Sequence, residues 1–149
     1  MHDVIHYDGV KRRVLVTQKA LPYPAGELVI SRVDLNGLIT FANESFVYLS
    51  GYSLAELIGK PHYVVRHPDM PKMVFKSMWA TIQAGKKWRG YIKNLCKDGT
   101  HYWVYATVIP NYRGGKVVSY TSVRRQASAA KISQMEADYQ VMREKEARQ

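Results

Sequence analysis

The chain has 149 residues, of which 46% are apolar, and this share is enough to fill the core of one domain and excludes general disorder. The formal net charge is +10, but the Lys and Arg residues are spread along the chain without forming a stripe, so we expect no nucleic acid as a partner. A single cysteine, Cys96, excludes an intrachain disulfide and is typical of the reducing cytoplasm, where we expect the chain to act. No run of about 18 apolar residues occurs, so we expect no membrane span.

The first 26 residues predict a loosely ordered N-terminal cap (1–26), which ends in the Pro- and Gly-rich stretch 22–26. A hairpin follows, because residues 27–33 and 38–42 are rich in residue types that favour strands and the segment Asp34-Leu35-Asn36-Gly37 between them is a turn sequence. We therefore place the start of the main domain at residue 27.

Three helical segments come next. Asn43 precedes a short helical pattern that ends at Gly51. Ser53 and Glu56 have the Ser-x-x-Glu spacing of a capping box, which predicts a second short helix. The spacing of the apolar residues then predicts a longer helix over about 71–84.

Three strand-like segments, at residues 87–96, 101–110 and 116–124, complete the domain, and turn sequences that contain Gly separate them. The order is therefore two strands, three helices and three strands, with hairpins at both ends. This order predicts an α+β fold over residues 27–125, with an antiparallel sheet and helices on one of its faces.

The last segment, residues 126–149, contains no Gly or Pro and is rich in Ala, Gln, Glu, Lys and Arg, which predicts a helix. Four of its apolar residues follow a 3-4-3 spacing, namely Ile132, Met135, Tyr139 and Met142. This spacing suits the seam of a coiled coil, and it equally suits an amphipathic helix that lies back on its own domain.

The loop Arg66-His67-Pro68-Asp69-Met70-Pro71 places a cation, an imidazole and a carboxylate within four positions. Its two prolines exclude a regular helix or strand, so we expect a shaped loop that carries polar groups to the edge of an apolar pocket. Such a loop is typical of a ligand site. The alternatives are an ion pair between Arg66 and Asp69, a helix cap formed by Asp69, and a purely structural role for His67.

Six motifs follow one another along the chain at characteristic spacing. In order they are Asn43-Glu44-Ser45-Phe46, the 66–71 loop, Met78-Trp79-Ala80-Thr81, Trp88-Arg89-Gly90, Lys93-Asn94 and Lys97-Asp98-Gly99-Thr100. Together they resemble the PAS domain of the Aer aerotaxis receptor family, and the resemblance covers roughly residues 16–126.

This resemblance implies a PAS fold with a five-stranded antiparallel sheet and a C-terminal signalling helix. It further implies a cytoplasmic FAD-binding sensor that detects oxygen or redox state and signals to a chemotaxis output. The C-terminal helix would lead to the protein's own downstream signalling domain, and a homodimer is possible. The cofactor-binding residues implied are Asn43, Arg66, His67, Trp79, Trp88 and Asn94.

The implied roles follow from the chemistry of a flavin. An amide offers a donor and an acceptor together, so we expect Asn94 to contact the edge of the flavin ring, with Asn43 as a second amide. The two Trp residues would form walls of the pocket, and Arg66 and His67 would lie near the phosphates or the adenine side.

Other functions agree less well with the residues. A haem would need an axial His on the helix after the loop, and residues 72–84 contain none. A photoreactive flavin domain would need a Cys within 60–63, where none occurs, so we expect Cys96 to be a bystander. The His-Pro-Asp tripeptide also occurs in chaperone J-domains, but those are helical hairpins. We see no catalytic set and no metal site, so we expect no enzyme. The remaining alternative is a ligand-free or haem-binding PAS module that acts through dimerisation.

Overall fold

The computed structural model describes residues 2–5 and 9–148. In chain order its elements are β1 (His2–Ile5), β2 (Lys11–Val14), β3 (Val29–Val33), β4 (Ile39–Ala42), α1 (Glu44–Ser50), α2 (Leu54–Leu57), the 3-10 helix η1 (His62–Val65), α3 (Lys72–Gln83), β5 (Trp88–Leu95), β6 (His101–Arg113), β7 (Lys116–Gln126) and α4 (Ala129–Ala147).

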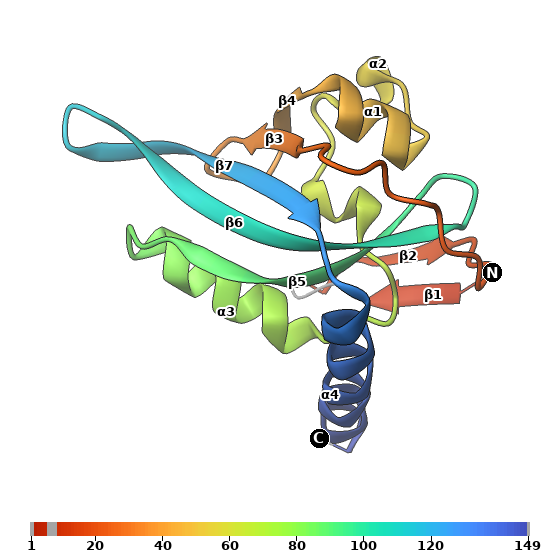
Figure 1. The fold of residues 1–149 in the computed structure, drawn as a ribbon. Coiled ribbons are helices and arrows are strands. Elements are labelled where there is room, and N and C mark those ends of the chain that lie inside the picture. The colour runs from red at the N-terminus through yellow and green to blue at the C-terminus, as the bar shows by residue number, and fades with distance from the viewer. Residues whose placement is uncertain (1, 6–8, 149) are drawn as a thin grey trace.

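Strands β3 to β7 form one sheet in the order β4-β3-β7-β6-β5, and every neighbouring pair in it is antiparallel. The N-terminal hairpin and the three C-terminal strands therefore meet along β3 and β7, where Val29 lies opposite Arg124 and Val33 opposite Tyr120. Figure 1 shows this sheet as a twisted layer with α1 and α2 at the β3–β4 end and α3 beside β5. The predicted α+β fold with a five-stranded antiparallel sheet is confirmed.

The β3–β4 hairpin forms because its turn sequence satisfies its own backbone. The Asp34 carboxylate accepts hydrogen bonds from the backbone N–H groups of Asn36 and Leu38. Gly37 has a φ of 82°, which a glycine adopts without strain. A Cβ at this position would also lie 3.1 Å from the ring of Trp79 on α3, so this turn packs closely against that helix.

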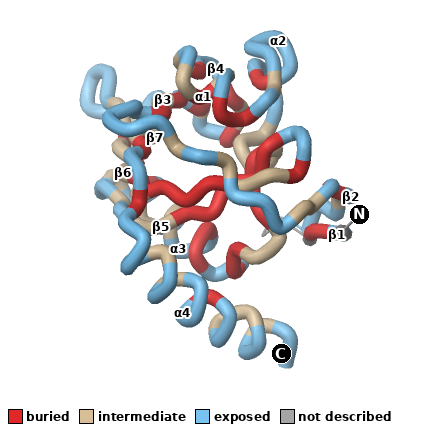
Figure 2. The backbone as a smooth tube through the Cα atoms, turned by 45° about the vertical axis from the view of Figure 1, so that its right-hand side comes forward, coloured by how far each residue is buried: buried red, intermediate tan, exposed pale blue. Residues whose placement is uncertain are grey.

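The hydrophobic core lies between the sheet and the helices α1 to α3. Its fully buried side chains come from strands and helices alike, with 0% exposure at Val29, Ile39, Phe46, Leu57 and Val104. Figure 2 shows the buried residues gathered along the central strands and on the inner sides of the helices. The alternation of buried and half-exposed residues along β3 and β6 agrees with the period of two that a strand imposes.

The N-terminal segment is more regular than the loose cap that we predict from the sequence. Strands β1 and β2 pair as a small antiparallel sheet, and Val4 and Val14 pack with Leu95 of β5 in a separate apolar cluster. The guanidinium of Arg12 donates to the backbone carbonyls of Tyr63 and Val64 at 2.7 and 3.1 Å. Strands β1 and β2 have only four residues each, so docking on the main domain stabilises them more than any pattern visible in the sequence.

Helix α4 lies back on its own domain. Tyr139 is buried, its ring stacks on that of Trp103 with centroids 6.0 Å apart, and its hydroxyl donates to the Tyr91 carbonyl at 2.6 Å. The other three residues of the predicted seam, Ile132, Met135 and Met142, also pack against the main core. The apolar stripe therefore faces the domain, as in the second of the two alternatives that the sequence leaves open.

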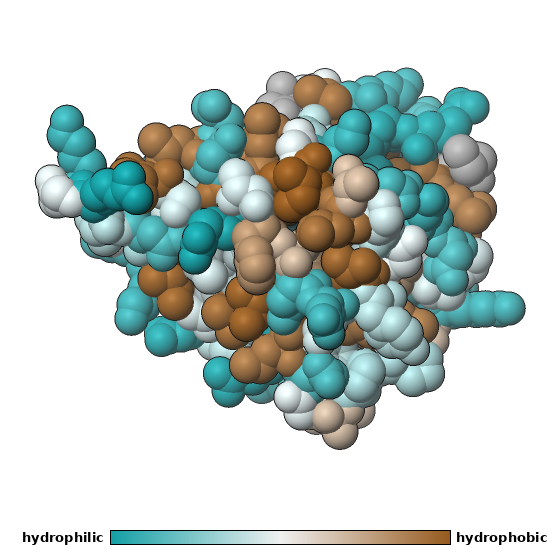
Figure 3. Space-filling view, turned by 90° about the horizontal axis from the view of Figure 1, so that it is seen from above, coloured by the Kyte–Doolittle hydropathy of each residue, from teal (hydrophilic) through white to brown (hydrophobic). Residues whose placement is uncertain are grey.

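The surface around α1, α2 and β4 carries several exposed apolar side chains. Figure 3 shows apolar groups gathered on the face seen from above. The exposed fractions reach 74% at Tyr48, 49% at Leu54 and 47% at Phe41. Within the described part of the chain, no helix is long and apolar enough to cross a membrane.

Candidate functional site

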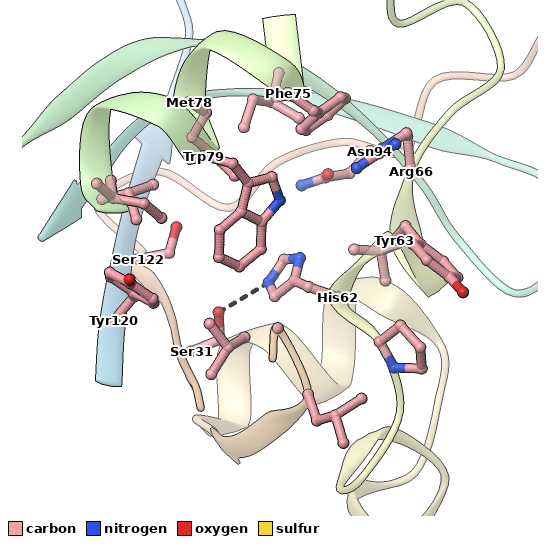
Figure 4. Close-up of a pocket in the computed structure, with 18 of the residues that line it drawn as sticks. Ser31, His62, Tyr63, Arg66, Phe75, Met78, Trp79, Asn94, Tyr120 and Ser122 are labelled. Atoms are coloured by element: carbon pink, nitrogen blue, oxygen red, sulfur yellow. Dashed lines mark hydrogen bonds between the residues drawn. The ribbon is translucent and has the colours of Figure 1, made fainter. Parts of the chain in front are cut away.

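A cavity of about 270 Å³ lies between α3, η1 and one face of the sheet, and Figure 4 shows its lining. Its size approaches the lower end of the range for small-molecule pockets, about 300 Å³. The side chains that line it come from the β3–β4 hairpin, η1 with its following loop, α3 and strands β5 to β7; they are Ser31, Val33, Asn36, Gly37, Leu38, Pro61, His62, Tyr63, Val65, Arg66, Phe75, Met78, Trp79, Ile82, Ile92, Asn94, Val108, Tyr120, Ser122 and Arg124.

Helix α3 supplies an aromatic wall. Trp79 meets Tyr120 of β7 edge to face, with the ring centroids 5.7 Å apart at an angle of 87°. Phe75, one turn earlier, lies under the guanidinium of Arg66, which is 3.6 Å from the centre of the ring. Flat apolar walls of this kind suit a planar ring system.

Asn94 brings an amide to this wall from near the C-terminal end of β5. The residue is only 3% exposed, and its backbone forms an isolated bridge with Arg66 of the loop. The side-chain nitrogen of Asn94 is buried and has no hydrogen-bond partner among the described residues. A buried amide N–H without a partner costs about 1–3 kcal/mol, so a ligand atom that accepts this hydrogen bond would be stabilising.

The sheet side of the cavity holds a network of three polar side chains. Arg124 of β7 donates through Nη2 to the Ser31 hydroxyl at 2.8 Å, and its Nη1 lies 3.0 Å from Nε2 of His62. The Ser31 hydroxyl also lies 3.0 Å from the same Nε2, as the dashed line in Figure 4 shows. Because a guanidinium can only donate, Nε2 of His62 accepts, and the proton of this imidazole is on Nδ1.

Burial and the nearby charges of Arg124 and Arg66 lower the pKa of His62 to about 3, so this imidazole is neutral at physiological pH. Burial also lowers the pKa of Arg124 to about 10, which leaves the guanidinium charged. The network therefore carries one net positive charge.

The comparison with known protein families rests on the same part of the chain. The model of the PAS fold family matches residues 39–124, which is more than half of the chain and includes most of the residues that line the cavity. The chain belongs to the PAS family.

This PAS domain is also similar to curated proteins with known names. It is 45% identical over 127 residues to the aerotaxis receptor of Escherichia coli (strain K12), an alignment that covers 85% of this chain and 25% of the receptor. It is 30% identical over 104 residues to the nitrogen fixation regulatory protein of Klebsiella pneumoniae, which covers 69% of this chain and 21% of that protein. The predicted resemblance to the PAS domain of the Aer family is confirmed. The chain spans about a quarter of the length of these relatives, which are named as a receptor and a regulatory protein.

Solved structures agree on the fold. A PAS domain from Colwellia psychrerythraea is 27% identical and superposes with a TM-score of 0.62, which covers 67% of this chain and 86% of that one. The light-state structure of the Aureochrome1 light-oxygen-voltage domain has a TM-score of 0.66 at 22% identity, and covers 75% of this chain and 90% of that chain. At this low identity the second similarity concerns the fold alone.

Three of the six residues proposed from the sequence, Arg66, Trp79 and Asn94, line the cavity of the PAS domain together. They come from the loop, from α3 and from β5, and the backbone bridge between Arg66 and Asn94 holds two of them side by side. The alternative prediction of an ion pair between Arg66 and Asp69 is wrong. The Asp69 carboxylate pairs instead with Lys93, whose Nζ lies 2.9 Å away.

Asn43 does not line the cavity, which corrects its prediction as a second amide at the ring edge. It is the N-cap of α1, where its side-chain oxygen accepts from the N–H groups of Phe46 and Ile30 and its nitrogen donates to the Leu28 carbonyl. These three hydrogen bonds of the Asn43 amide join β3 to the start of α1.

His67 and Trp88 also lie outside the cavity. His67 is 1% exposed and accepts through Nδ1 from the backbone N–H of Asp69 at 3.0 Å, so its structural role is the better description. Trp88 lies over Gly90 and lines a second, shallow groove between α3, β5 and α4. The backbone at Arg66 is extended, and while Arg66 lines the cavity, the next residue, His67, meets His101 at a ring distance of 5.8 Å.

The residues that the sequence did not single out are Ser31, His62 and Arg124. The signal for Ser31 was weak but present, since this polar residue lies between the apolar, inward-facing Val29 and Val33 of β3. Burial raises the pKa of the Cys96 thiol to about 11, which disfavours the reactive thiolate at neutral pH.

Helix α3, the wall of the cavity, begins without a cap of its own. Pro71 is at its N-cap position and makes no side-chain capping bond, which rules out the capping role considered for Asp69. The carboxylate of Glu146 on α4 takes this role and accepts from the N–H groups of Lys72 and Met73 at 3.1 and 2.9 Å. One turn earlier, Arg143 donates to the Asp69 carbonyl at 2.5 Å. The end of α4 is therefore fastened to the wall of the cavity.

Replacing Glu146 by Ala should cost about 1 kcal/mol of local stability at the start of α3, as the loss of an N-cap does elsewhere. Hydrogen exchange of the Lys72 and Met73 amides should become roughly fivefold faster, as about 1 kcal/mol predicts. The matched control is Glu144→Ala on the same helix, whose carboxylate bonds only to Gln140 among the described residues. Equal exchange rates at the two amides in the wild type and in Glu146→Ala would contradict the capping role.

Proposed function

We propose that this PAS domain binds a flavin, specifically FAD, in the cavity between α3 and the sheet, and that it detects redox or oxygen state for an aerotaxis output. The observation that carries the proposal is the buried Asn94 amide, whose N–H has no partner among the described residues and lies in a cavity with aromatic walls. The 45% identity to the aerotaxis receptor of Escherichia coli supports the same function.

The residues present fit the ring of a flavin. Its pyrimidine edge carries carbonyl oxygens and ring nitrogens, and the Asn94 amide can donate to the former and accept from a protonated nitrogen. Trp79 and Phe75 offer apolar faces, and Arg66 lies at the loop, where a cation would stabilise phosphate. The choice of FAD over FMN rests on the resemblance to the Aer family.

When bound, a flavin supplies reversible electron and proton transfer, and the contribution of the chain is binding and orientation. A change in the protonation of the ring would change what Asn94 donates or accepts. The backbone bridge from Asn94 to Arg66 passes that change to the 66–71 loop, which Arg143 and Glu146 join to α4. The output would then be a change in the ratio of two conformations, one with α4 docked on the domain and one with α4 released.

The partners that this proposal includes are the protein's own downstream signalling domain, reached through α4, and a second copy of the chain. A cytoplasmic location is part of the same proposal. Haem is the second ligand to test, because His62 lines the cavity, but its Nε2 is held by Ser31 and Arg124 and two cations are nearby. This environment disfavours coordination of a metal cation.

The visible absorption spectrum of the purified protein tests the proposal. We expect the absorption bands of a bound flavin. Liquid chromatography of the cofactor released from the protein should identify it as FAD. A protein that stays colourless after incubation with FAD would exclude the proposed function and leave a ligand-free interaction module. An intense Soret band would show haem instead.

Replacing Asn94 by Ala should lower the affinity for flavin by about tenfold or more, because the ring edge loses a buried hydrogen bond. The matched control is Asn111→Ala on β6, whose amide bonds to Ser119 and Thr121 away from the cavity. Flavin content per protein and the dissociation constant after reconstitution are the measurements. Full retention of flavin by Asn94→Ala would remove this residue from the site.

A further inference from the structure

The hairpin of β6 and β7 extends beyond the sheet as a two-stranded ribbon. The pairing of β5 with β6 ends at Trp88 and Val108, and the pairing of β3 with β7 ends at Val33 and Tyr120. Residues 109–119 therefore have no third strand beside them, and Figure 1 shows their turn projecting past the rest of the domain. The end of this ribbon is solvent-exposed and adds little to the core.

The end of the ribbon lies beside the turn between α3 and β5. The hydroxyl of Tyr112 donates to the backbone carbonyl of Gly85 at 2.9 Å, which joins the two turns. Four exposed cations flank this contact, and we call them the basic tip. They are Lys86, Lys87, Arg113 and Lys116.

The fold itself gains nothing from the charge of the basic tip. Arg113 lies directly opposite Lys116 in the register of the two strands, and like charges in this position are destabilising. None of the four cations forms an ion pair with another described residue. A negatively charged partner would relieve this repulsion.

The distribution of charge along the chain agrees with this view. Residues 70–135 contain 12 Lys and Arg residues but one acidic residue, Asp98. Asp98 precedes β6, at the other end of that strand from the basic tip, and its carboxylate accepts from Thr100. Asp34 follows Val33 at the near end of β3, but its carboxylate accepts from two backbone N–H groups of its own turn. The basic tip therefore produces a local positive potential.

We propose that the basic tip is a docking surface for a lipid bilayer that carries anionic headgroups. The inference does not depend on the proposed flavin, because the basic tip lies outside the cavity. Long Lys and Arg side chains can reach the phosphate groups of a bilayer while the backbone stays outside it. Each cation near an anionic leaflet strengthens binding about fivefold.

Exposed apolar side chains at the same place favour a bilayer over other polyanions. Tyr112 is 57% exposed and Val118 is 42% exposed. A Tyr ring suits the level of the headgroups, where apolar contact adds to the attraction between charges. A nucleic acid needs a basic stripe or groove that follows its phosphates, whereas this surface is the narrow end of a ribbon.

Co-sedimentation of the full chain with vesicles tests the proposal. Vesicles of phosphatidylcholine with about a third of phosphatidylglycerol should bind the chain, and vesicles of phosphatidylcholine alone should not. Binding should fall as the salt concentration rises. The double variants Lys86→Gln with Lys87→Gln, and Arg113→Gln with Lys116→Gln, should each bind the anionic vesicles roughly twentyfold more weakly.

The matched control is Lys19→Gln with Lys131→Gln, which removes the same charge from exposed positions near the other end of the strands. This control should bind anionic vesicles with an affinity close to that of the wild type. A loss equal to that of the two tip variants would show that net charge alone acts, and would overturn the proposal. No binding of the wild type to anionic vesicles, or equal binding to neutral ones, would overturn it as well.

A further variant separates a bilayer from another polyanion. Val118→Ser keeps every charge and should bind anionic vesicles severalfold more weakly, because an apolar contact with the bilayer is lost. Unchanged vesicle binding by this variant would contradict the proposal. Tighter binding of the wild type to duplex DNA or to polyglutamate than to anionic vesicles would overturn it in favour of a nucleic acid or an acidic protein.

Discussion

Lowering the pH from 7.5 to 5 should reduce the free energy of unfolding of the ligand-free domain by about 4 kcal/mol, as two histidines with strongly lowered pKa values predict. His62 and His67 both have a pKa of about 3 in the folded state. Burial is the main cause for each, and nearby cations add to it, Arg124 for His62 and Lys93 for His67.

The direction of this pH effect depends on whether the folded or the unfolded state binds more protons. An unfolded histidine has a pKa near 6.5, so below that pH the unfolded chain takes up protons that the folded chain refuses. Stability therefore rises with pH up to about 6.5 and is lost as the pH falls below it. At pH 5, about 1.5 units below the unfolded pKa, each histidine contributes a loss of about 2 kcal/mol. The pKa of His101 is lowered in the same direction, while Asp69, whose pKa is lowered from 3.8, titrates below this window.

Urea unfolding at pH 7.5 and at pH 5, followed by Trp fluorescence, measures the difference. His67→Asn is the informative variant, because the Asn oxygen can still accept from the backbone N–H of Asp69 but takes up no proton in this range. Its pH dependence should be smaller than that of the wild type by about 2 kcal/mol. Equal stability of the wild type at both pH values would refute the neutral state of the two imidazoles.

Replacing Phe46 by Ala should destabilise the domain by about 3–5 kcal/mol, which is the usual loss for a buried Phe. Phe46 is 0% exposed, stacks on His62 with ring centroids 5.7 Å apart and lies under the guanidinium of Arg124. Its loss leaves a cavity in the core and removes the ring face that supports a buried cation. A total stability of about 5–15 kcal/mol is typical, so a large part of it would be lost.

The control lies on the same helix. Tyr48 is 74% exposed, so Tyr48→Ala should change the free energy of unfolding by no more than about 0.5 kcal/mol. Denaturant midpoints of the two variants and of the wild type provide the comparison. A midpoint of Phe46→Ala close to that of Tyr48→Ala would show that this position is not part of the cooperative core.

The sequence was sufficient to predict the elements whose signals are local. The turn at Asp34–Gly37 has its hydrogen bonds within five residues, and the capping box of Ser53 and Glu56 forms as its spacing predicts. Hairpin turns also defined β5, β6 and β7, although β6 extends to Arg113, past Pro110. That extension depends on the pairing of β6 with β7, which keeps Pro110 opposite Tyr120.

The site was harder to predict from the sequence, because segments that are far apart along the chain form it. Ser31 and Arg124 meet only through the pairing of β3 with β7, and His62 joins them from η1. The place of Asn43 directly before α1 is typical of an N-cap, whereas the resemblance to the family implied a flavin contact for this residue. The cap supplied by Glu146 lies 74 residues from Lys72, and no local pattern reports it.

The contacts made by Arg12 indicate where the folded unit of this PAS domain begins. The match to the family starts at residue 39, but the guanidinium of Arg12 lies against the carbonyls of Tyr63, Val64 and Arg66, at the end of η1. Those carbonyls belong to the segment that presents His62 and Arg66 to the cavity. These contacts join the N-terminal sheet to the segment that lines the cavity, so the packed unit extends beyond the residues that the family model matches.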